Sequence, residues 1–509
     1  MTAAEDTIRT ARDRLRIVNG TEPADSADDS KDRKPSHGAL MRQLLDDHYT
    51  LVRSTDGRTY GIANTDPGRA IAHAPQSSPL IRGVSRMFLD TTGQWPSSTG
   101  VAEASAYTLA MFDEAPVRPV PLRSHWDRSR RVLHLDTCDQ AGTVLRIDAD
   151  GVRPAVAPVA FRQPAVPCPI PWDSTEGTPA DIARLWGIVP VAKQDRPIVL
   201  AAMITAWLTE TPQPIVFLTG TQDAGKTSTA RYLLSFVDPV GVPRGKALPV
   251  DEREWKSAVA YSRAVLVDNL SGLNAAASDL LCRVSTGGEA SSRALYTDDG
   301  THVTALHVPV WLTAIDAGAL RGDLASRMVK VELLPLDETS RLAESDLADK
   351  QEEIRQEVTR GLLWLASAVF DDWASVNTSR LPHRMGDFAI ILRCIDQIMG
   401  TNGEARLVED AQDLAADVVD ASPIALAVVK LAEAGGTDWA TSTALLERLN
   451  EAEKAADQWW RPDKGWPRTP KVLSAQLTRV APALRKARGI DVEHRKSNGT
   501  RLIRIVKAA

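Results

Sequence analysis

The sequence is poor in the features that mark secreted, metal-binding and membrane-spanning proteins. Its 509 residues include only four cysteines, which lie far apart at positions 138, 168, 282 and 394. No pair has the spacing of a metal site, so reduced thiols are expected. The first residues lack the apolar core of a signal peptide, and the longest apolar stretch, residues 198–208, is too short to cross a bilayer. We therefore expect a cytoplasmic protein with no membrane partner.

The bulk composition is that of an ordinary globular protein, but the charge is unevenly distributed. Hydrophobic residues make up 43% and charged residues 25% of a chain long enough for two to four domains. From Arg461 onward, thirteen Lys or Arg face three acids, which gives a local charge of +10 and leaves −16 for the rest of the chain. This asymmetry indicates a basic, nucleic-acid-binding module at the C-terminus.

The N-terminal third carries no recognisable catalytic constellation. A short helix over residues 5–17 and a disordered linker are expected before residue 38. Strand-like runs around the turn at Asp56 and Gly57, a helix near residues 100–112, and two further strands then predict an α+β accessory domain. His134 and Asp136 share one strand face, and we interpret that face as solvated rather than as a site.

A glycine-rich stretch follows the apolar run at residues 215–219. Gly220, four residues, then Gly225, Lys226 and Thr227 give the spacing of a P-loop. Glycines let backbone N–H groups point inward at a phosphate, and the helix expected after the loop presents its positive N-terminal end. We expect Lys226 to contact the β- and γ-phosphates of ATP and Thr227 to bind Mg²⁺.

This segment, residues 220–227, is called the glycine loop below. The predicted nucleotide-binding residues are Gly220, Thr221, Gln222, Asp223, Ala224, Gly225, Lys226, Thr227 and Ser228. The alternative is a chance glycine turn, which the strand expected before the loop and the helix expected after it disfavour.

An acidic residue ends the next apolar run, residues 264–267. Asp268 is expected to hold Mg²⁺, directly or through water, and the alternative is a solvated aspartate at a strand end. Many such ATPases place a glutamate next to this aspartate, where Asn269 stands here. Asparagine can position water but cannot accept its proton. Hydrolysis is therefore expected to be slow unless another acid serves, and the candidates Asp251, Glu252 and Glu254 also fit a solvated helix start.

Residues 293–306 have the pattern of a β-hairpin with its turn at Asp298, Asp299 and Gly300. The strand that follows, residues 308–313, ends on Thr313. Such a polar residue can sense the γ-phosphate or place water, and an ordinary buried threonine is the equal alternative.

Two arginines lie shortly before the next strand. Arg327 is the first candidate for an arginine finger that projects into the nucleotide site of a neighbouring subunit, and Arg321 is the second. A guanidinium there would neutralise transition-state charge, which is worth about 10³–10⁵ in rate. The alternative is a salt bridge from Arg327 to Asp323 or Glu332.

The C-terminal segment has the outline of a winged helix. Thr469 fits an N-cap and Pro470 the first helical position, Pro482 is expected to kink the helix or end it early, and Gly489 stops it. The apolar stripe of this helix is Leu473, Leu477, Val480 and Leu484. A basic hairpin follows, with its turn at residues 497–499.

The basic residues of this helix and hairpin are the predicted DNA contacts. They are Lys471, Arg479, Arg485, Lys486, Arg488, Arg495, Lys496 and Arg501. Phosphate contacts from such a patch would be salt-sensitive. A winged helix that docks on protein, or a merely solvated basic face, remains the alternative.

The order of these motifs resembles superfamily 3 helicases of the AAA+ class, which include poxvirus-type primase-helicases and the polyomavirus large T antigen. The chain is more closely similar to ATP-binding proteins of actinobacterial prophages and integrative elements. The resemblance covers residues 164–509. The matching stretches are 268–271, 281–283, 286–288, 293–298, 322–324 with Arg327, 384–388 and 466–469.

The resemblance implies a homo-oligomeric ring, with a hexamer as the expected size and ATP and Mg²⁺ bound between subunits. Carried onto this sequence, Gly225, Lys226 and Thr227 bind phosphates and Mg²⁺, Asp268 is the metal acid, Thr313 the sensor and Arg327 the finger. The hairpin tip at residues 298–300 would face the DNA. The sequence departs from the family pattern in four places: the tip is acidic, Thr313 replaces an asparagine, and Asn269 and Asp223 stand at atypical positions.

The predicted fold class is α/β, and the expected parts are five. They are a disordered segment (1–37), the accessory domain (38–171), a P-loop AAA+ core (172–336), a helical region (337–434) and a winged helix (435–509). The first functional hypothesis is an ATP-driven helicase or translocase that acts on single-stranded DNA or an origin duplex during replication of a mobile element. The second is an ATP-dependent DNA-binding assembly switch with little hydrolysis. A small-molecule P-loop kinase is the third, which the basic C-terminus and the candidate finger disfavour.

Overall fold

A computed structural model describes most of the chain. The described residues are 35–73, 78–164, 166–241, 245–260, 262–270, 272–293, 301–314, 320–336, 342–462, 465–497 and 499–507. The predicted N-terminal segment lies almost entirely outside them. Two compact units are distinguished: one consists of the described residues up to Asp47 together with Ile81–Thr108, and the other of His48–Leu80 and Leu109–Ala509.

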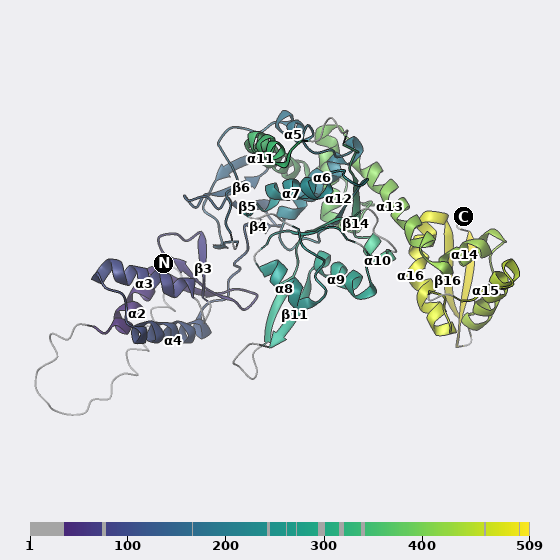
Figure 1. The fold of residues 1–509 in the computed structure, drawn as a ribbon, viewed down its shortest axis with the longest axis horizontal. Helices are drawn as coiled ribbons and strands as arrows, with labels where there is room; N and C mark the ends of the chain where they lie inside the picture. The colour runs from purple at the N-terminus through teal and green to yellow at the C-terminus, as the bar shows by residue number, and fades with distance from the viewer. Residues whose placement is uncertain are drawn as a thin grey trace, which may run out of the picture. The chain divides into compact units, whose positions relative to one another are not determined.

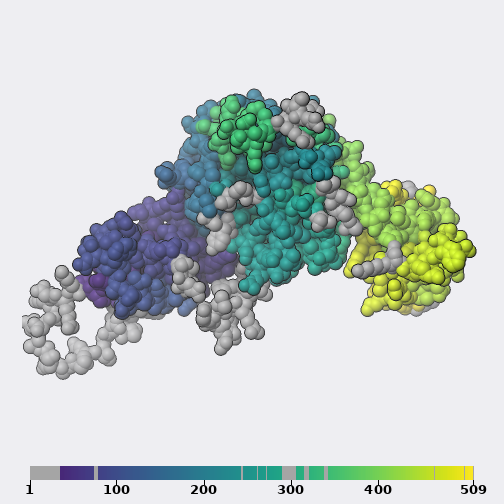
Figure 2. All heavy atoms as spheres, in the orientation of Figure 1, coloured from purple at the N-terminus to yellow at the C-terminus, as the bar shows by residue number. Residues whose placement is uncertain are grey.

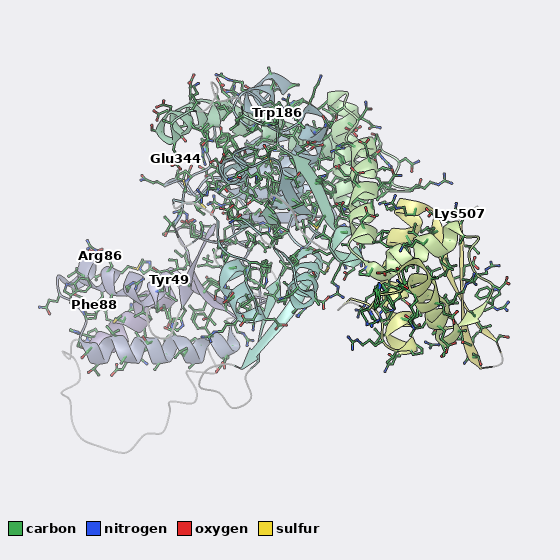
Figure 3. The ribbon with its side chains drawn as sticks, turned by 45° about the vertical axis from the view of Figure 1, so that its right-hand side comes forward. Tyr49, Arg86, Phe88, Trp186, Glu344 and Lys507 are labelled. Carbon is green, nitrogen blue, oxygen red and sulfur yellow. The ribbon has the colours of Figure 1, made fainter. Side chains whose placement is uncertain are left out.

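The first unit is built from three helices, α2 (His37–His48), α3 (Pro79–Thr92) and α4 (Ser98–Glu114), which lie side by side in Figure 1. Phe88 of α3 is buried and its ring lies 4.8 Å from that of His37, centroid to centroid (Figure 3). The Tyr107 hydroxyl donates to the Asp46 carboxylate at 2.9 Å. Apolar burial and one tyrosine–carboxylate bond therefore hold these helices together.

The second unit begins with a small mixed sheet of strand order β1-β2-β3-β8. Its strands are β1 (Tyr49–Arg53), β2 (Thr59–Ala63), β3 (Arg69–His73) and β8 (Phe161–Arg162). Strands β1 and β2 pair antiparallel, and Gly57 in the turn between them has a φ of 79°. A positive φ is easily adopted by glycine, so the hairpin predicted around Asp56 and Gly57 is confirmed.

A second, antiparallel sheet has the order β4-β5-β6-β7. It consists of β4 (Ser124–Asp127), β5 (Val132–Asp136), β6 (Val144–Asp148) and β7 (Gly151–Pro154). Trp126 and Leu133 belong to the same hydrophobic cluster as the long helix α11 (Glu344–Asp372), and Ser367 of that helix donates to the Asp148 carbonyl at 2.6 Å. This sheet therefore packs with the region that follows it, and the predicted boundary at residue 171 does not separate them.

The other face of β5 is also buried, which corrects the interpretation of His134 and Asp136. His134 is 7% exposed and Asp136 is 2% exposed, so they do not lie on a solvated face. Asp136 accepts hydrogen bonds from the Cys138 backbone N–H at 2.8 Å and from Gln163 Nε2 at 3.1 Å. Its carboxylate anchors the loop after β5, which is a structural role.

The central sheet is parallel, with the order β10-β13-β9-β14. Its strands are β9 (Ile215–Thr219), β10 (Val265–Val267), β13 (Val310–Thr313) and β14 (Met328–Glu332). Val216 and Leu218 point into a cluster with α6 (Arg196–Trp207), α7 (Lys226–Val237) and α11, whereas Ile215 and Phe217 point into a second cluster. Both faces are covered, as expected of a parallel sheet, and the α/β fold class is confirmed.

Shorter elements surround this sheet. They are α5 (Pro179–Leu185), η1 (Lys193–Asp195), α8 (Glu252–Ala260), α9 (Ala275–Thr286), α10 (Gly322–Ala325) and the hairpin β11 (Gly288–Arg293) with β12 (Thr301–Leu306). The two hairpin strands pair antiparallel from Gly288 with Leu306 to Arg293 with Thr301. The predicted tip at Asp298, Asp299 and Gly300 lies outside the described residues.

The helical region predicted after residue 337 contains α11, α12 (Gly386–Met399), α13 (Gly403–Asp420) and α14 (Pro423–Glu433); α11 starts at Glu344 (Figure 3). Helix α14 packs on α16 (Pro470–Arg488) and on β17 (Thr500–Lys507). These contacts cross the predicted boundary between residues 434 and 435. We call residues 423–507 the C-terminal fold.

The C-terminal fold has the element order α14, β15 (Ala440–Thr441), α15 (Ser442–Ala456), α16, β16 (Ile490–Ser497) and β17. A three-stranded sheet of order β15-β17-β16 lies beside the helices, which are labelled at the yellow end of Figure 1. In α16, Leu473, Leu477 and Leu484 are fully buried. The surface of this fold is drawn in yellow-green and yellow in the space-filling view (Figure 2). Helix α16 continues through Pro482 to Arg488, so the proline does not end it early.

Among the described residues, no helix is both long and apolar enough to cross a membrane.

Candidate nucleotide site and basic surface

The glycine loop connects β9 to α7, as its spacing predicted. Three of its residues have positive φ angles: 154° at Gly220, 64° at Asp223 and 69° at Gly225. Aspartate tolerates the left-handed region better than most residues with a side chain, which explains how Asp223 occupies a position where glycine is common. Lys226 Nζ donates to the carbonyls of Gly220 at 3.1 Å and Thr221 at 2.7 Å. The loop's own carbonyls therefore hold the ammonium across the loop.

The carboxyl ends of three parallel strands bring the predicted site residues together. Asp268 follows β10, and its Oδ1 accepts hydrogen bonds from the Thr227 hydroxyl at 2.7 Å and the Thr313 hydroxyl at 2.5 Å. The Asn269 backbone N–H donates to Thr313 Oγ1 at 3.0 Å. Thr313 is 2% exposed, so it is both a buried threonine and a member of this cluster. Its hydroxyl fixes the orientation of the Asp268 carboxylate.

Sequence reasoning missed the segment that flanks Asp268 on its other side. Lys246 makes an isolated parallel bridge with Val267, and its carbonyl accepts from the Asp268 backbone N–H at 3.0 Å. Gly245 has a φ of 125°, and a Cβ there would lie 3.5 Å from Asp268 Oδ2. The sequence around Gly245 and Lys246 is a weak signal, because nothing in it shows that this segment lies next to Asp268.

Asn269 has a φ of 55°, in the left-handed region. Asparagine is among the few non-glycine residues that adopt this conformation readily. The backbone therefore gives a conformational reason for asparagine at a position where the family resemblance leads one to expect glutamate.

The three acids considered as substitutes for a glutamate are engaged at the start of α8. Glu252 pairs with Arg283 at 2.6 Å, Asp251 Oδ1 accepts from the Glu254 N–H at 2.9 Å, and Glu254 accepts from the Val250 N–H at 2.9 Å. These bonds match the prediction of a helix start, since side chains commonly accept hydrogen bonds from the first N–H groups of a helix.

The structure does not bring the two candidate finger arginines to the glycine loop of their own chain. The Ile215 N–H donates to the Arg327 carbonyl at 2.9 Å, which places Arg327 beside the start of β9, whereas the glycine loop follows its end. Five strand residues span roughly 13–16 Å. Arg327 is 8% exposed, and its guanidinium donates to the Asp323 carbonyl at 2.5 Å. Arg321 instead pairs with Asp279 at 3.0 Å.

All eight predicted DNA contacts are exposed on α16, β16 and β17 or next to them: Lys471, Arg479, Arg485, Lys486, Arg488, Arg495, Lys496 and Arg501. Side chains with blue nitrogen tips project from this fold in Figure 3, where Lys507 marks the end of β17. Arg485 pairs with Asp491 at 3.2 Å and Arg488 with Asp420 at 2.9 Å. These bonds are exposed, so they cost little to exchange for phosphate.

An aromatic residue that sequence reasoning missed organises part of this basic surface. The Arg495 guanidinium lies 4.3 Å and that of Arg504 5.0 Å from the ring centroid of Trp439. Cation–π contacts of this kind orient arginine side chains, and Arg504 also pairs with Glu493 at 2.6 Å. The only signal in the sequence is a single tryptophan just before β15. It cannot be interpreted without knowing that the hairpin of β16 and β17 lies beside it.

Two models of known protein families match long stretches of this chain. Residues 182–417 match the family model of the actinomycete integrative conjugative element replication protein, and residues 424–509 match that of the AICE RepA C-terminal domain. These matches confirm the resemblance to proteins of actinobacterial integrative elements. The second match begins within α14, where the C-terminal fold begins. No curated protein matches the chain.

Similar solved structures include the NrS-1 C terminal region, with a TM-score of 0.38 and 9% identity over 94% of this chain and 100% of that chain. A JCV helicase matches with a TM-score of 0.23 and 14% identity over 47% of this chain and 64% of that chain. Both TM-scores are below 0.5, so neither likeness establishes a fold or a function for this chain.

Proposed function

We propose that this chain, which over two long stretches is similar to replication proteins of actinomycete integrative conjugative elements, is an ATP-hydrolysing DNA helicase or translocase in replication of such an element. It would combine a P-loop AAA+ core with a C-terminal winged helix. It would work as a homo-oligomer, with a hexamer as the expected size and nucleotide bound between subunits.

The observation that carries the proposal is the meeting of Lys226, Thr227, Asp268 and Thr313 at one edge of the parallel sheet. Backbone N–H groups of the glycine loop and the start of α7 would surround the phosphates. Lys226 would exchange its two loop carbonyls for phosphate oxygens. The sheet order, with the glycine loop after the inner strand β9 and Asp268 after β10, supports an AAA+ core.

The donor set suits Mg²⁺ rather than a transition metal. Among the described residues, no group of three or more His, Cys, Asp or Glu could hold a metal ion. The Thr227 hydroxyl and the Asp268 carboxylate offer two adjacent oxygens, and Mg²⁺ characteristically takes one or two protein oxygens together with phosphate oxygens and water. When bound there, Mg²⁺ would neutralise charge on the phosphates.

In the proposed oligomer, Arg321 or Arg327 would act on a neighbouring subunit's nucleotide and would first have to leave its present partner, Asp279 for Arg321 and the Asp323 carbonyl for Arg327. Both arginines precede β14, and Arg327 lies at the amino end of the neighbouring strand β9, whereas the glycine loop follows its carboxyl end. We therefore propose that either arginine would act on the nucleotide of a neighbouring subunit. The element order of the C-terminal fold and the exposure of all eight predicted DNA contacts support DNA binding through a winged helix.

An ATPase assay with and without single-stranded DNA tests this function. We expect DNA to stimulate wild-type turnover, and Lys226→Ala to reduce turnover by at least about 100-fold because the phosphate charge loses its fixed cation. Lys350→Ala, an exposed change on α11, is the matched control and should behave as wild type. An ATP turnover rate that is the same with and without single-stranded DNA would exclude the helicase or translocase function.

A second candidate function, an assembly switch with little hydrolysis, is favoured by Asn269. In that case Asn269→Glu should raise a slow wild-type turnover by about tenfold, because a carboxylate can accept the proton of the attacking water. Glutamate at a φ of 55° costs about 1 kcal/mol, so Asn269→Gly serves as the strain-free control. Robust wild-type turnover without any gain in Asn269→Glu would remove the switch.

A further inference from the structure

A cavity of about 200 Å³ lies apart from the glycine loop, between the β1–β2 turn, the end of α8 and the end of β12. Its walls hold three arginines, Arg58, Arg162 and Arg263, and two histidines, His125 and His307. Asp56 and Glu210 are the acids that line it. The proposed nucleotide and DNA sites use none of these residues.

Arg263 is the innermost cation of this cavity and is 8% exposed. Its Nε donates to the Ser124 hydroxyl at 3.0 Å, while its Nη2 is buried without a hydrogen-bond partner among the described residues. The nearest acid, Asp238, is already paired with Arg123 at 3.0 Å and accepts from the Arg263 backbone N–H at 2.7 Å. Burial lowers the pKa of Arg263 to about 10, as expected of a cation with too little counter-charge.

Arg162 repeats this pattern at the next position. Its Nη1 donates to the Ala260 carbonyl at 2.5 Å, and its Nε is buried without a partner among the described residues. Asp56 is engaged by Arg58 at 3.7 Å. Glu210 is exposed and therefore belongs to the rim. Two buried guanidinium N–H groups thus remain without an acceptor, and each costs about 1–3 kcal/mol while unpaired.

The histidines do not add to the positive charge at neutral pH. Burial lowers the pKa of His307 to about 4, and burial also lowers the pKa of His125. Both rings are therefore neutral near pH 7 and can offer one N–H each. His307 Nε2 is buried without a hydrogen-bond partner among the described residues. The cavity consequently combines fixed cationic donors with neutral donors.

We propose that this cavity is a second phosphate-binding site, which takes one phosphate group between Arg162 and Arg263. Arginine N–H groups match the geometry of phosphate oxygens, and such charge-assisted bonds are the stronger class. A cavity of about 200 Å³ suits a phosphate group better than a whole nucleotide, since drug-sized ligands occupy about 300–1,000 Å³. The group can come from free phosphate or from the backbone of a DNA strand.

The site is tested in full-length protein that carries Lys226→Ala, so that the glycine loop does not contribute. Binding of inorganic phosphate is measured by calorimetry and by the shift of Tm, against chloride at equal ionic strength. We expect binding that weakens by about tenfold in Arg162→Gln. Equal phosphate affinity in the Lys226→Ala protein with and without Arg162→Gln, or no binding by either, would overturn the proposal. Buried water would then be the partner of the Arg162 and Arg263 N–H groups.

Thr55→Glu gives a second variant that leaves both buried arginines in place. Thr55 is exposed on the rim, and a carboxylate there should repel the anion and weaken phosphate binding, whereas Thr65→Glu, an exposed change away from the cavity, should not. If Arg162→Gln does not fold, this pair alone decides: equal phosphate affinity in the two rim variants overturns the proposal.

A single-stranded oligo(dT) distinguishes the source of the phosphate. A DNA affinity that falls in Thr55→Glu but not in Thr65→Glu, and that inorganic phosphate competes away, assigns a strand phosphate. Phosphate binding without this difference assigns a free oxyanion. Because every arm is run without a functional glycine loop, loss of the proposed ATPase would not affect the result.

Discussion

The glycine-loop edge and the C-terminal fold handle negative charge in opposite ways. At the edge, side chains that follow three strands meet through bonds of 2.5–2.7 Å on one carboxylate, Asp268. On the C-terminal fold, eight basic side chains stand exposed along one helix and one hairpin. We therefore expect each converging residue of the proposed nucleotide site to be hard to replace, and the proposed DNA surface to lose affinity for DNA in small steps. The comparison predicts different sensitivity to single substitutions.

The largest effect is expected at the point of convergence. Asp268→Asn should lower ATP turnover by about 100-fold, because the neutral amide cannot hold Mg²⁺ against phosphate charge. Steady-state ATPase kinetics at saturating Mg²⁺ measure it. Asp349→Asn, exposed on α11, is the control. Near-normal turnover in Asp268→Asn would mean that the hydrogen-bonded cluster is structural only.

A smaller effect is expected on the basic surface. Lys471→Gln and Arg479→Gln should each weaken DNA binding by about three- to tenfold and reduce the slope of log K against log salt by about one, since each removes one phosphate contact. Fluorescence anisotropy over a salt series measures both quantities. Lys454→Gln on α15 is the exposed control. Loss of all binding from one substitution would contradict a distributed surface.

The smallest effect concerns helix α13, which contacts both β14 and α16 and so touches both regions. Burial raises the pKa of Asp410 on this helix to about 7, although Arg406 lies 2.9 Å away, because Asp195 shares that arginine. A raised folded-state pKa means that stability is present at low pH and is lost as the pH rises from about 4 through about 7.

Asp410→Asn should therefore stabilise the protein above pH 7, by on the order of 1–2 kcal/mol, and leave it unchanged near pH 4. Denaturant unfolding at the two pH values measures the gap. If the variant is less stable than wild type at pH 8, the ionised carboxylate of Asp410 is stabilised in the folded protein. Ionisation of Asp410 would then not destabilise α13.

The predictable parts were those set by local pattern. The spacing around Lys226 and the apolar run before Asp268 each fix a position within a few residues, and helix α16 follows from its cap and apolar stripe. The Thr313–Asp268 bond joins residues 45 positions apart, and nothing in either segment specifies it. His134 is misinterpreted for the same reason: its ring stacks on that of His125 and its strand partner is Arg146, and neither neighbour can be read from the strand's own alternation. Long-range contacts hide such burial from local periodicity.

The arginines show where local reasoning ends. Arg327 was identified from its place before a strand, yet its guanidinium is turned into its own chain. Arg162 donates to the Ala260 carbonyl, 98 residues away, and Arg263 donates to the Ser124 hydroxyl, 139 residues away. Each guanidinium keeps one buried N–H group without a partner among the described residues. A short stretch of sequence cannot show that these two arginines come together, or that too few acids lie near them to balance their charge.

The bonds from Lys226 to the carbonyls of Gly220 and Thr221 have a kinetic consequence. If ATP binds as proposed, an arriving phosphate would replace the two hydrogen bonds that the ammonium already makes. The affinity for nucleotide would then be the difference between two hydrogen-bonded states, and the lysine could return to its loop carbonyls when the nucleotide leaves. In the proposed ATPase, such a loop would favour rapid exchange of nucleotide over tight retention.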